Sequence, residues 1–106
     1  MFLILWEFEV KPGCEQSFES AYGPDGAWSR LFGRDQGFHR TQLLKDPSRP
    51  RVYFTLDFWH TKAAYGSFAA ANSEAYQALD RSTEYLTSRE THLGLFSETE
   101  PNTPSA

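Results

Sequence analysis

The sequence predicts an α+β domain of the ferredoxin-like class, with the element order β-α-β-β-α-β and an antiparallel sheet. Two observations lead to this class. In the first segment, large apolar residues recur at every second position, at Ile4, Trp6, Phe8 and Val10, which is the period of a half-buried strand. Further along, two segments rich in β-forming residues flank a polar turn, and a long helical segment and a last strand follow.

Two short helices are predicted after the first strand. Lys11-Pro12-Gly13 ends the strand, and apolar residues at helical spacing predict an amphipathic helix over 14–22. The turn-forming stretch 23–26 then restarts a helix in which residues 28–32 share an apolar face. We expect Gly33 to end this helix as a left-handed cap.

A hairpin is predicted in the middle of the chain. The second strand covers 38–45 and the third covers 51–59, which is rich in aromatic and β-branched residues. Between them, 46–50 contains two prolines and reads as a polar turn. The two strands therefore pair as neighbours.

The second half of the chain reads as a broken helix and a strand. Thr61 is suited to cap the helix, and Asn72-Ser73 predicts a break after which Ser73 caps a second segment. The last strand is expected over about 89–96, which completes one domain of residues 1–96. Residues 97–106 contain two prolines and no bulky apolar residue, so we expect a disordered C-terminal tail.

Length and charge narrow the function classes. The chain of 106 residues has a net charge of -4 and no basic cluster, which argues against nucleic acid as a partner. Its apolar N-terminal run, Phe2 to Trp6, is too short to span a bilayer, which takes about 20 residues, and it lacks the basic start of a signal peptide. The single Cys14 cannot form an internal disulfide. We therefore expect a cytoplasmic protein with no membrane partner.

The strands also predict a partner for the sheet. The third strand is apolar on both sides, with Val52, Phe54, Leu56 and Phe58 on one face and Tyr53, Thr55, Asp57 and Trp59 on the other. Helices can cover only one of these faces. A homodimer that packs sheet on sheet is the simplest cover for the other.

The order of motifs resembles that of the antibiotic biosynthesis monooxygenase family, over about residues 2–96. The resemblance implies a dimeric α+β barrel with a pocket between helices and sheet. Members include cofactor-free oxygenases of polyphenols, haem-degrading enzymes, isomerases and proteins without known activity. The similar motifs are Trp6-x-Phe8-x-Val10-Lys11-Pro12-Gly13, Phe18-Glu19-x-x-Tyr22, the stretch from Tyr22 to Phe32, Gly37-Phe38, and Trp59 before a helix with Tyr65 and Phe68.

The resemblance argues against haem degradation. The haem-degrading members use an Asn, a Trp and a His at three positions. Alignment through Gly13 and Trp59 places Trp6, Phe68 and Ala78 there, so none matches and the axial ligand is missing. Nor does the chain have the ligand spacing of a zinc site. We therefore expect neither a cofactor nor a metal.

A cofactor-free oxygenase needs a dry aromatic slot, a base that titrates near neutral pH and a donor for the developing oxyanion. His39, on the second strand, is the first candidate for the base because histidine titrates in this range. Asp57 is the second candidate, since a buried carboxylate can have a raised pKa. Surface exposure of His39, and pairing of Asp57 with Arg40 or with a partner chain, are the structural alternatives.

The chain is rich in rings, with three Trp, five Tyr and nine Phe, which indicates an aromatic core or a pocket for flat ligands. The function predicted is a cofactor-independent monooxygenase of an aromatic or polyphenolic small molecule. A non-catalytic ligand-binding or stress-associated dimer, and an isomerase or decarboxylase on the same fold, remain alternatives. The expected pocket residues, whose alternative is plain core, are Trp6, Trp28, Phe32, Tyr65 and Phe68.

Overall fold

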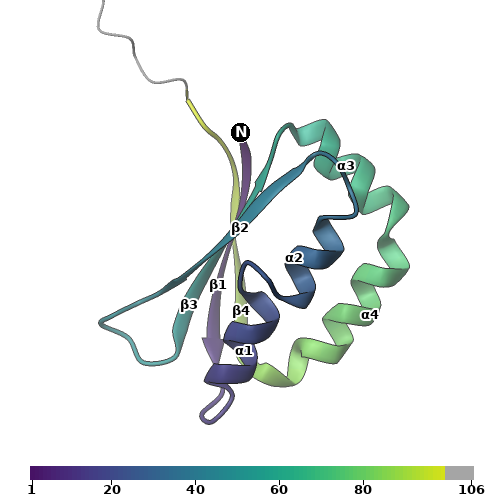
Figure 1. Cartoon of the computed structure of the whole chain (residues 1–106). Helices are drawn as coiled ribbons and strands as arrows, with labels where there is room; N and C mark the ends of the chain where they lie inside the picture. Colours follow the sequence, from purple (N-terminus) through teal and green to yellow (C-terminus); the bar gives the residue numbers. More distant parts are fainter. Residues whose placement is uncertain (100–106) are drawn as a thin grey trace, which may run out of the picture.

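Four strands and two pairs of helices make up the computed structural model, which describes residues 1–99. The helices all lie on one side of the sheet (Figure 1). In chain order the elements are β1 (Phe2–Val10), α1 (Glu15–Tyr22), α2 (Ala27–Phe32), β2 (Phe38–Lys45), β3 (Val52–Trp59), α3 (Lys62–Ala71), α4 (Ser73–Thr83), the 3-10 turn η1 (Glu84–Leu86) and β4 (Thr87–Ser97).

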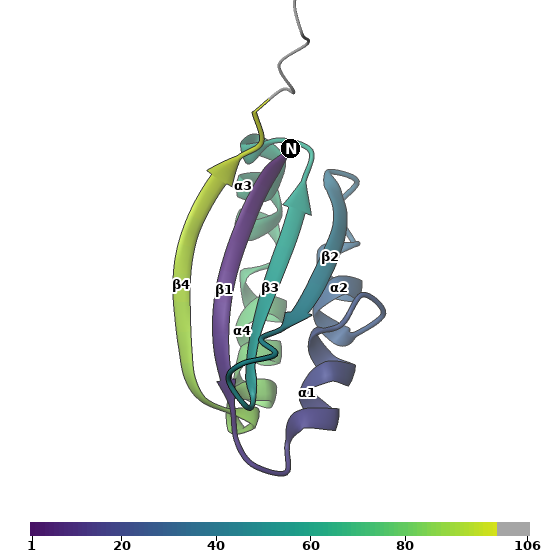
Figure 2. The ribbon, with the colours of Figure 1, turned by 90° about the vertical axis from the view of Figure 1, so that its left-hand side faces the viewer.

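The sheet has the order β2-β3-β1-β4, and every neighbouring pair is antiparallel. Figure 2 shows the strands side by side in this order, with the helices behind them. This is the arrangement expected of a β-α-β-β-α-β unit, so the predicted fold class is confirmed. Register shifts interrupt the ladders at three places, at Leu5/Trp6 and Glu9/Val10 between β1 and β4 and at Phe38/Arg40 between β2 and β3. The shift at Phe38/Arg40 is a bulge that leaves His39 without a partner in the pairing with β3.

The core lies between the sheet and the helices and consists mostly of rings. Every second residue of β1 faces it, and the rings of Phe8 and Phe18 lie 5.2 Å apart. At the other end, the Phe68 ring of α3 lies 5.2 Å from Trp59 and 5.4 Å from Phe32. Ring pairs at these separations contribute roughly 0.5–1.5 kcal/mol beyond the burial of their area. The aromatic core therefore fixes the helices on this face of the sheet.

Several predicted boundaries and caps can now be compared with the structure. Thr61 caps α3 as expected, since its Oγ1 accepts a hydrogen bond from the Ala64 backbone N–H at 3.1 Å. The left-handed cap at Gly33 is wrong, because Gly33 has φ -66° and its N–H bonds back to the Ser29 carbonyl in a right-handed turn. The cap at Ser73 is also wrong, since Asn72 holds the N-cap position of α4 and makes no side-chain capping bond.

The last strand is longer than predicted at both ends. It begins at Thr87, which pairs with Val10, and it ends at Ser97, which pairs with Phe2. Ser97 is therefore part of the sheet and not of the predicted tail. The remainder of that tail from residue 100 onward lies outside the described residues. Within residues 1–99, no helix is long and apolar enough to cross a membrane.

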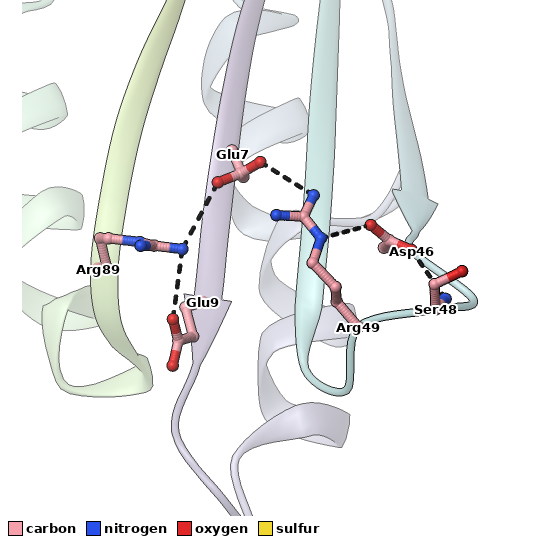
Figure 3. A network of polar contacts seen from close by, with 6 residues as sticks. All are labelled: Glu7, Glu9, Asp46, Ser48, Arg49 and Arg89. Carbon is pink, nitrogen blue, oxygen red and sulfur yellow. Dashed lines mark hydrogen bonds and ion pairs between the residues drawn. The ribbon is translucent and has the colours of Figure 1, made fainter.

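The face of the sheet away from the helices is apolar in its upper part and charged at its lower end. Leu56 and Phe54 are only partly covered there, and Leu44 is 42% exposed. At the charged end, Arg49 and Arg89 bridge three carboxylates in a chain of ion pairs (Figure 3). The bridged carboxylates are Glu7, Glu9 and Asp46, at distances of 2.7 to 3.6 Å.

Candidate active site

A cavity opens between the sheet and the helices α1, α2 and α4. It encloses about 460 Å³ of atom-free space with its open mouth included, and the centres of water molecules can occupy about 50 Å³ of it. The 50 Å³ is room for several waters and is smaller than the roughly 300–1,000 Å³ of most small-molecule sites, so a larger ligand would also occupy the open mouth. The lining residues are Trp6, Phe8, Tyr22, Trp28, Phe32, Thr41, Thr55, Asp57, Tyr76, Asp80 and Glu90.

Asp57 is the buried carboxylate of this cavity. It lies on the central strand β3, between Ile4 of β1 and Thr41 of β2, and only 7% of it is exposed. Burial raises the pKa of Asp57 to about 7, against a smaller lowering by the Thr41 hydroxyl, which donates to its Oδ1 at 2.7 Å. A carboxylate with this pKa can both accept and release a proton near neutral pH.

Pairing of Asp57 with Arg40, one of the alternatives considered, does not occur. Arg40 pairs in register with Phe58 and lies over its ring at 4.0 Å, on the opposite face of the sheet. No ion pair of the described residues includes Asp57. Its charge is therefore not neutralised by the part of the chain that the structure describes, which is consistent with burial as the main cause of the raised pKa.

The cavity walls are aromatic. The Trp28 ring lies 5.0 Å from the Tyr76 ring in an edge-on arrangement and 5.8 Å from the Phe32 ring. Burial raises the pKa of Tyr76 to about 12, so its hydroxyl stays protonated and can donate a hydrogen bond. The Nε1 of Trp28 is buried and makes no hydrogen bond of regular geometry with the described residues, although it is near enough to the Tyr22 hydroxyl to lower slightly the pKa of that group, which burial raises. A buried donor left unpaired costs stability, so a ligand acceptor that reached it would be favoured.

The remaining acidic residues lie around the mouth. Asp80 of α4 and Glu90 of β4 line the cavity and are both exposed. Partial burial, with a further contribution from the charge of Asp80, raises the pKa of Glu90. The Thr87 hydroxyl donates to Glu90 Oε1 at 3.3 Å. The cavity thus has one carboxyl group inside and two near its entrance.

His39 does not line this cavity. It is exposed at the bulge of β2, where its ring lies 5.5 Å from the ring of His60. It borders a different, shallow surface hollow together with Arg30 and Arg40. Thr41 is buried and lines both the hollow and the cavity. Asp57, and not His39, is therefore the candidate base whose side chain borders the enclosed space.

Three of the five predicted pocket rings line the cavity, namely Trp6, Trp28 and Phe32. Tyr65 and Phe68 do not. Phe68 is 1% exposed and belongs to the core, and Tyr65 is partly buried with its ring 5.4 Å from that of Trp59. Tyr65 and Phe68 therefore lie in or against the aromatic core and do not line the cavity.

Several lining residues were missed from the sequence. Thr55 stands two positions before Asp57, so strand alternation puts both on one face. Tyr76 and Asp80 are four residues apart and therefore share one face of α4. These spacings could have identified them. Among residues 1–99, no three His, Cys, Asp or Glu side chains are grouped as metal ligands.

Comparisons with known proteins agree with this fold. The chain is similar to SnoaB, a cofactor-independent oxygenase from Streptomyces nogalater, with 22% identity over 95% of each chain and TM-scores of 0.77 and 0.75 for two crystal structures. It is also similar to a protein from Bordetella bronchiseptica assigned to antibiotic biosynthesis monooxygenases, with 21% identity over 93% of this chain and 97% of that one, and a TM-score of 0.73. No curated protein matches the chain by sequence.

At these identities the structural neighbours establish the fold, and the family follows from the sequence itself. The family model described as antibiotic biosynthesis monooxygenase matches residues 1–82, which is more than half of the chain. This match confirms the resemblance drawn from the motifs around Gly13, Gly37 and Trp59. The chain belongs to the antibiotic biosynthesis monooxygenase family.

Proposed function

We propose that this protein is a cofactor-independent monooxygenase of an aromatic small molecule, with Asp57 as the base. The observation that carries the proposal is the place of Asp57, a carboxyl group buried in an aromatic cavity with its pKa raised to about 7. The family to which the chain belongs supports the reaction type. The name of SnoaB as a cofactor-independent oxygenase supports it further.

The chemistry asks for three contributions from the protein. Asp57 accepts the proton of a phenolic or enolic group, and the electron-rich anion that results reacts with oxygen. The Tyr76 hydroxyl and the Trp28 Nε1 are the cavity's candidate donors to the developing oxyanion. The rings exclude water, which strengthens both interactions. These three roles are assigned on geometry and pKa together.

An isomerase or decarboxylase would use the same site in part. Each needs one acid-base group and a shaped cavity, but neither consumes oxygen. The purely ligand-binding alternative is less favoured, because the chain's own side chains leave the cavity partly empty around an unpaired carboxyl group. Oxygen consumption therefore separates the proposal from both alternatives.

We also propose that the functional unit is a homodimer. The face of the sheet away from the helices exposes Leu44 and partly exposes Phe54 and Leu56, and Leu5 extends the same face on β1. Contiguous apolar surface of this kind usually marks an interface. The chain of ion pairs around Arg49 gives that face a charged end. We propose a second copy of this chain as the partner of this face, because a two-fold dimer pairs one surface patch with the same patch on the other subunit.

The test is oxygen uptake with a panel of hydroxylated polycyclic phenols, comparing wild type with Asp57→Asn and His39→Ala. We expect Asp57→Asn to lose about 10²–10⁴ in turnover, which is the usual contribution of a positioned base. His39→Ala is the matched control and should keep the wild-type rate, because His39 lies outside the cavity. If the losses are reversed, the base is His39. If the panel is converted without oxygen consumption, an isomerase or decarboxylase is the better assignment.

A further inference from the structure

We infer that the ligand of this cavity is a flat aromatic molecule that carries a positively charged nitrogen, a protonated amine or a quaternary ammonium group. If the proposed function holds, this molecule is the substrate of the enzyme. The binding preference itself does not require catalysis. The inference is based on three features of the cavity: its acidic lining, its aromatic walls without a Lys or Arg over them, and the buried Nε1 of Trp28.

The cavity is lined by acidic groups and by no basic ones. Its lining contains the carboxyl groups of Asp57, Asp80 and Glu90, and no lining residue is Arg, Lys or His. In a cleft with apolar walls, charges of one sign reinforce one another and concentrate ligands of the opposite sign. A ligand that enters as an anion would meet unfavourable charge at the mouth and again inside. A cationic ligand would be favoured at both.

Within residues 1–99, no ion pair neutralises these carboxyl groups. The ion pairs found among residues 1–99 join other groups, mostly Arg49 and Arg89 with carboxylates on the opposite face of the sheet. The hydroxyls of Thr41 and Thr87 donate to Asp57 and Glu90, which leaves the negative charge in place. In the sheet, Arg49 and Arg89 thus pair with carboxylates of the far face, and His92 lies beside the cavity wall with its ring 4.8 Å from that of Trp6.

The ring faces of the cavity are likewise free of cations. Cations lie over rings at three places in the described residues, with Arg40 over Phe58, Lys45 over Tyr53 and Arg49 over Phe54. None of these three rings lines the cavity. The tryptophan and tyrosine rings that do line it are the types that bind cations best through their faces. Aromatic rings together with carboxylates that form no ion pair are the groups that bind ammonium ions in proteins.

The third feature concerns the rest of the ligand. Trp28 lines the cavity, is 6% exposed and has an Nε1 donor whose nearest polar neighbour is the Tyr22 hydroxyl, with which it makes no hydrogen bond of regular geometry. An oxygen acceptor on the ligand, such as the hydroxyl that Asp57 deprotonates, would satisfy that donor. The structure therefore points to an aromatic core with an oxygen at one side and a cationic nitrogen toward the acidic mouth.

Three naphthalene probes of similar shape and different charge test this inference by calorimetry. They are N,N,N-trimethyl-2-naphthylammonium, neutral 2-naphthol and anionic 2-naphthoate. We expect the cation to bind about tenfold more tightly than naphthol, as one cation–π contact with a desolvated charge would give, and naphthoate to bind most weakly. Added salt should reduce the preference. Equal binding of all three probes, tighter binding of naphthoate, or no binding of the cation would overturn the inference.

A double variant assigns the preference to the mouth. Asp80→Asn with Glu90→Gln should remove most of the cation's advantage over naphthol in binding. The matched control is Asp25→Asn with Glu74→Gln, which changes the net charge equally at exposed positions outside the cavity. If the control double variant reduces cation binding as much as the mouth variant, only the net charge of the chain matters and the inference fails.

The site of binding can be read from the tryptophan indole resonances. Trp28 and Trp59 both have a buried, unpaired Nε1, but only Trp28 lines the cavity. On addition of the cationic probe, the Trp28 Nε1–H signal should shift and that of Trp59 should stay. These measurements need no turnover. Cation preference without oxygen uptake would therefore refute the proposed function alone, and oxygen uptake without cation preference would refute this inference alone.

Discussion

Replacement of Asp57 by Asn should make the protein more resistant to rising pH. In the folded protein burial raises the pKa of Asp57 from 3.8 to about 7. Between these values the folded state holds a proton that the unfolded state has lost. The free energy of unfolding therefore falls as the pH rises through this range. An asparagine does not titrate, and its side-chain oxygen can still accept the hydrogen bond from Thr41.

The size of the effect follows from the difference between the two pKa values. Each unit corresponds to 1.36 kcal/mol, so full ionisation of Asp57 costs the folded state about 4 kcal/mol. A change from pH 5 to pH 8 covers the upper part of the range between the two pKa values. Over this change we expect the free energy of unfolding of wild type to fall by about 2–3 kcal/mol more than that of Asp57→Asn. Other titrating groups, including Glu90, contribute equally to both proteins and cancel.

The assay is urea denaturation of both proteins at pH 5 and pH 8, at one chain concentration so that any association equilibrium is held constant. Asp25→Asn is the control, because it removes one exposed carboxylate at a position outside the cavity. If wild type and Asp57→Asn lose stability in parallel between the two pH values, Asp57 titrates near its ordinary pKa. The electrostatic basis of the proposed base would then be refuted.

Two further predictions concern the packing and the assembly. Gly37→Ala should lower the melting temperature, at a cost of about 1–3 kcal/mol, because a methyl group there would collide with the Ala64 side chain of α3. The matched control Gly66→Ala, with open space around it in α3, should raise stability by about 0.5–1 kcal/mol; equal effects of the two would contradict the close approach. Sedimentation should give twice the chain mass of 12.1 kDa, and Leu56→Asp should shift the protein toward monomer; a stable wild-type monomer at micromolar concentration would exclude the proposed homodimer.

Much of the fold could be predicted because its signals are local. The alternation in β1 and the turn that separates the hairpin strands are visible in single segments, and β2 begins and ends at the predicted residues 38 and 45. The caps were less predictable. Gly33 ends α2 in a right-handed turn. Its N–H donates to the Ser29 carbonyl in this conformation, so the left-handed geometry that glycine permits is not used.

The candidate site depends on a feature that alternation cannot reveal. In a regular strand His39 and Thr41 would face the same side. The bulge at Phe38/Arg40 adds a residue, so Phe38 and Thr41 both face the helices and His39 leaves the ladder. The pairing of Thr41 with Asp57 follows from this register. The choice between Asp57 and His39 therefore required the structure.

The central claim is that Asp57 is a neutral-range acid-base group inside the cavity, and its carboxyl titration tests this most directly. In protein labelled with ¹³C at the aspartate carboxyl carbons, the Asp57 signal, assigned by its loss in Asp57→Asn, should titrate with a midpoint near pH 7. Thr41→Val should move that midpoint upward, because the Thr41 hydroxyl favours the ionised form. A midpoint near the ordinary aspartate value of about 4 would contradict the account.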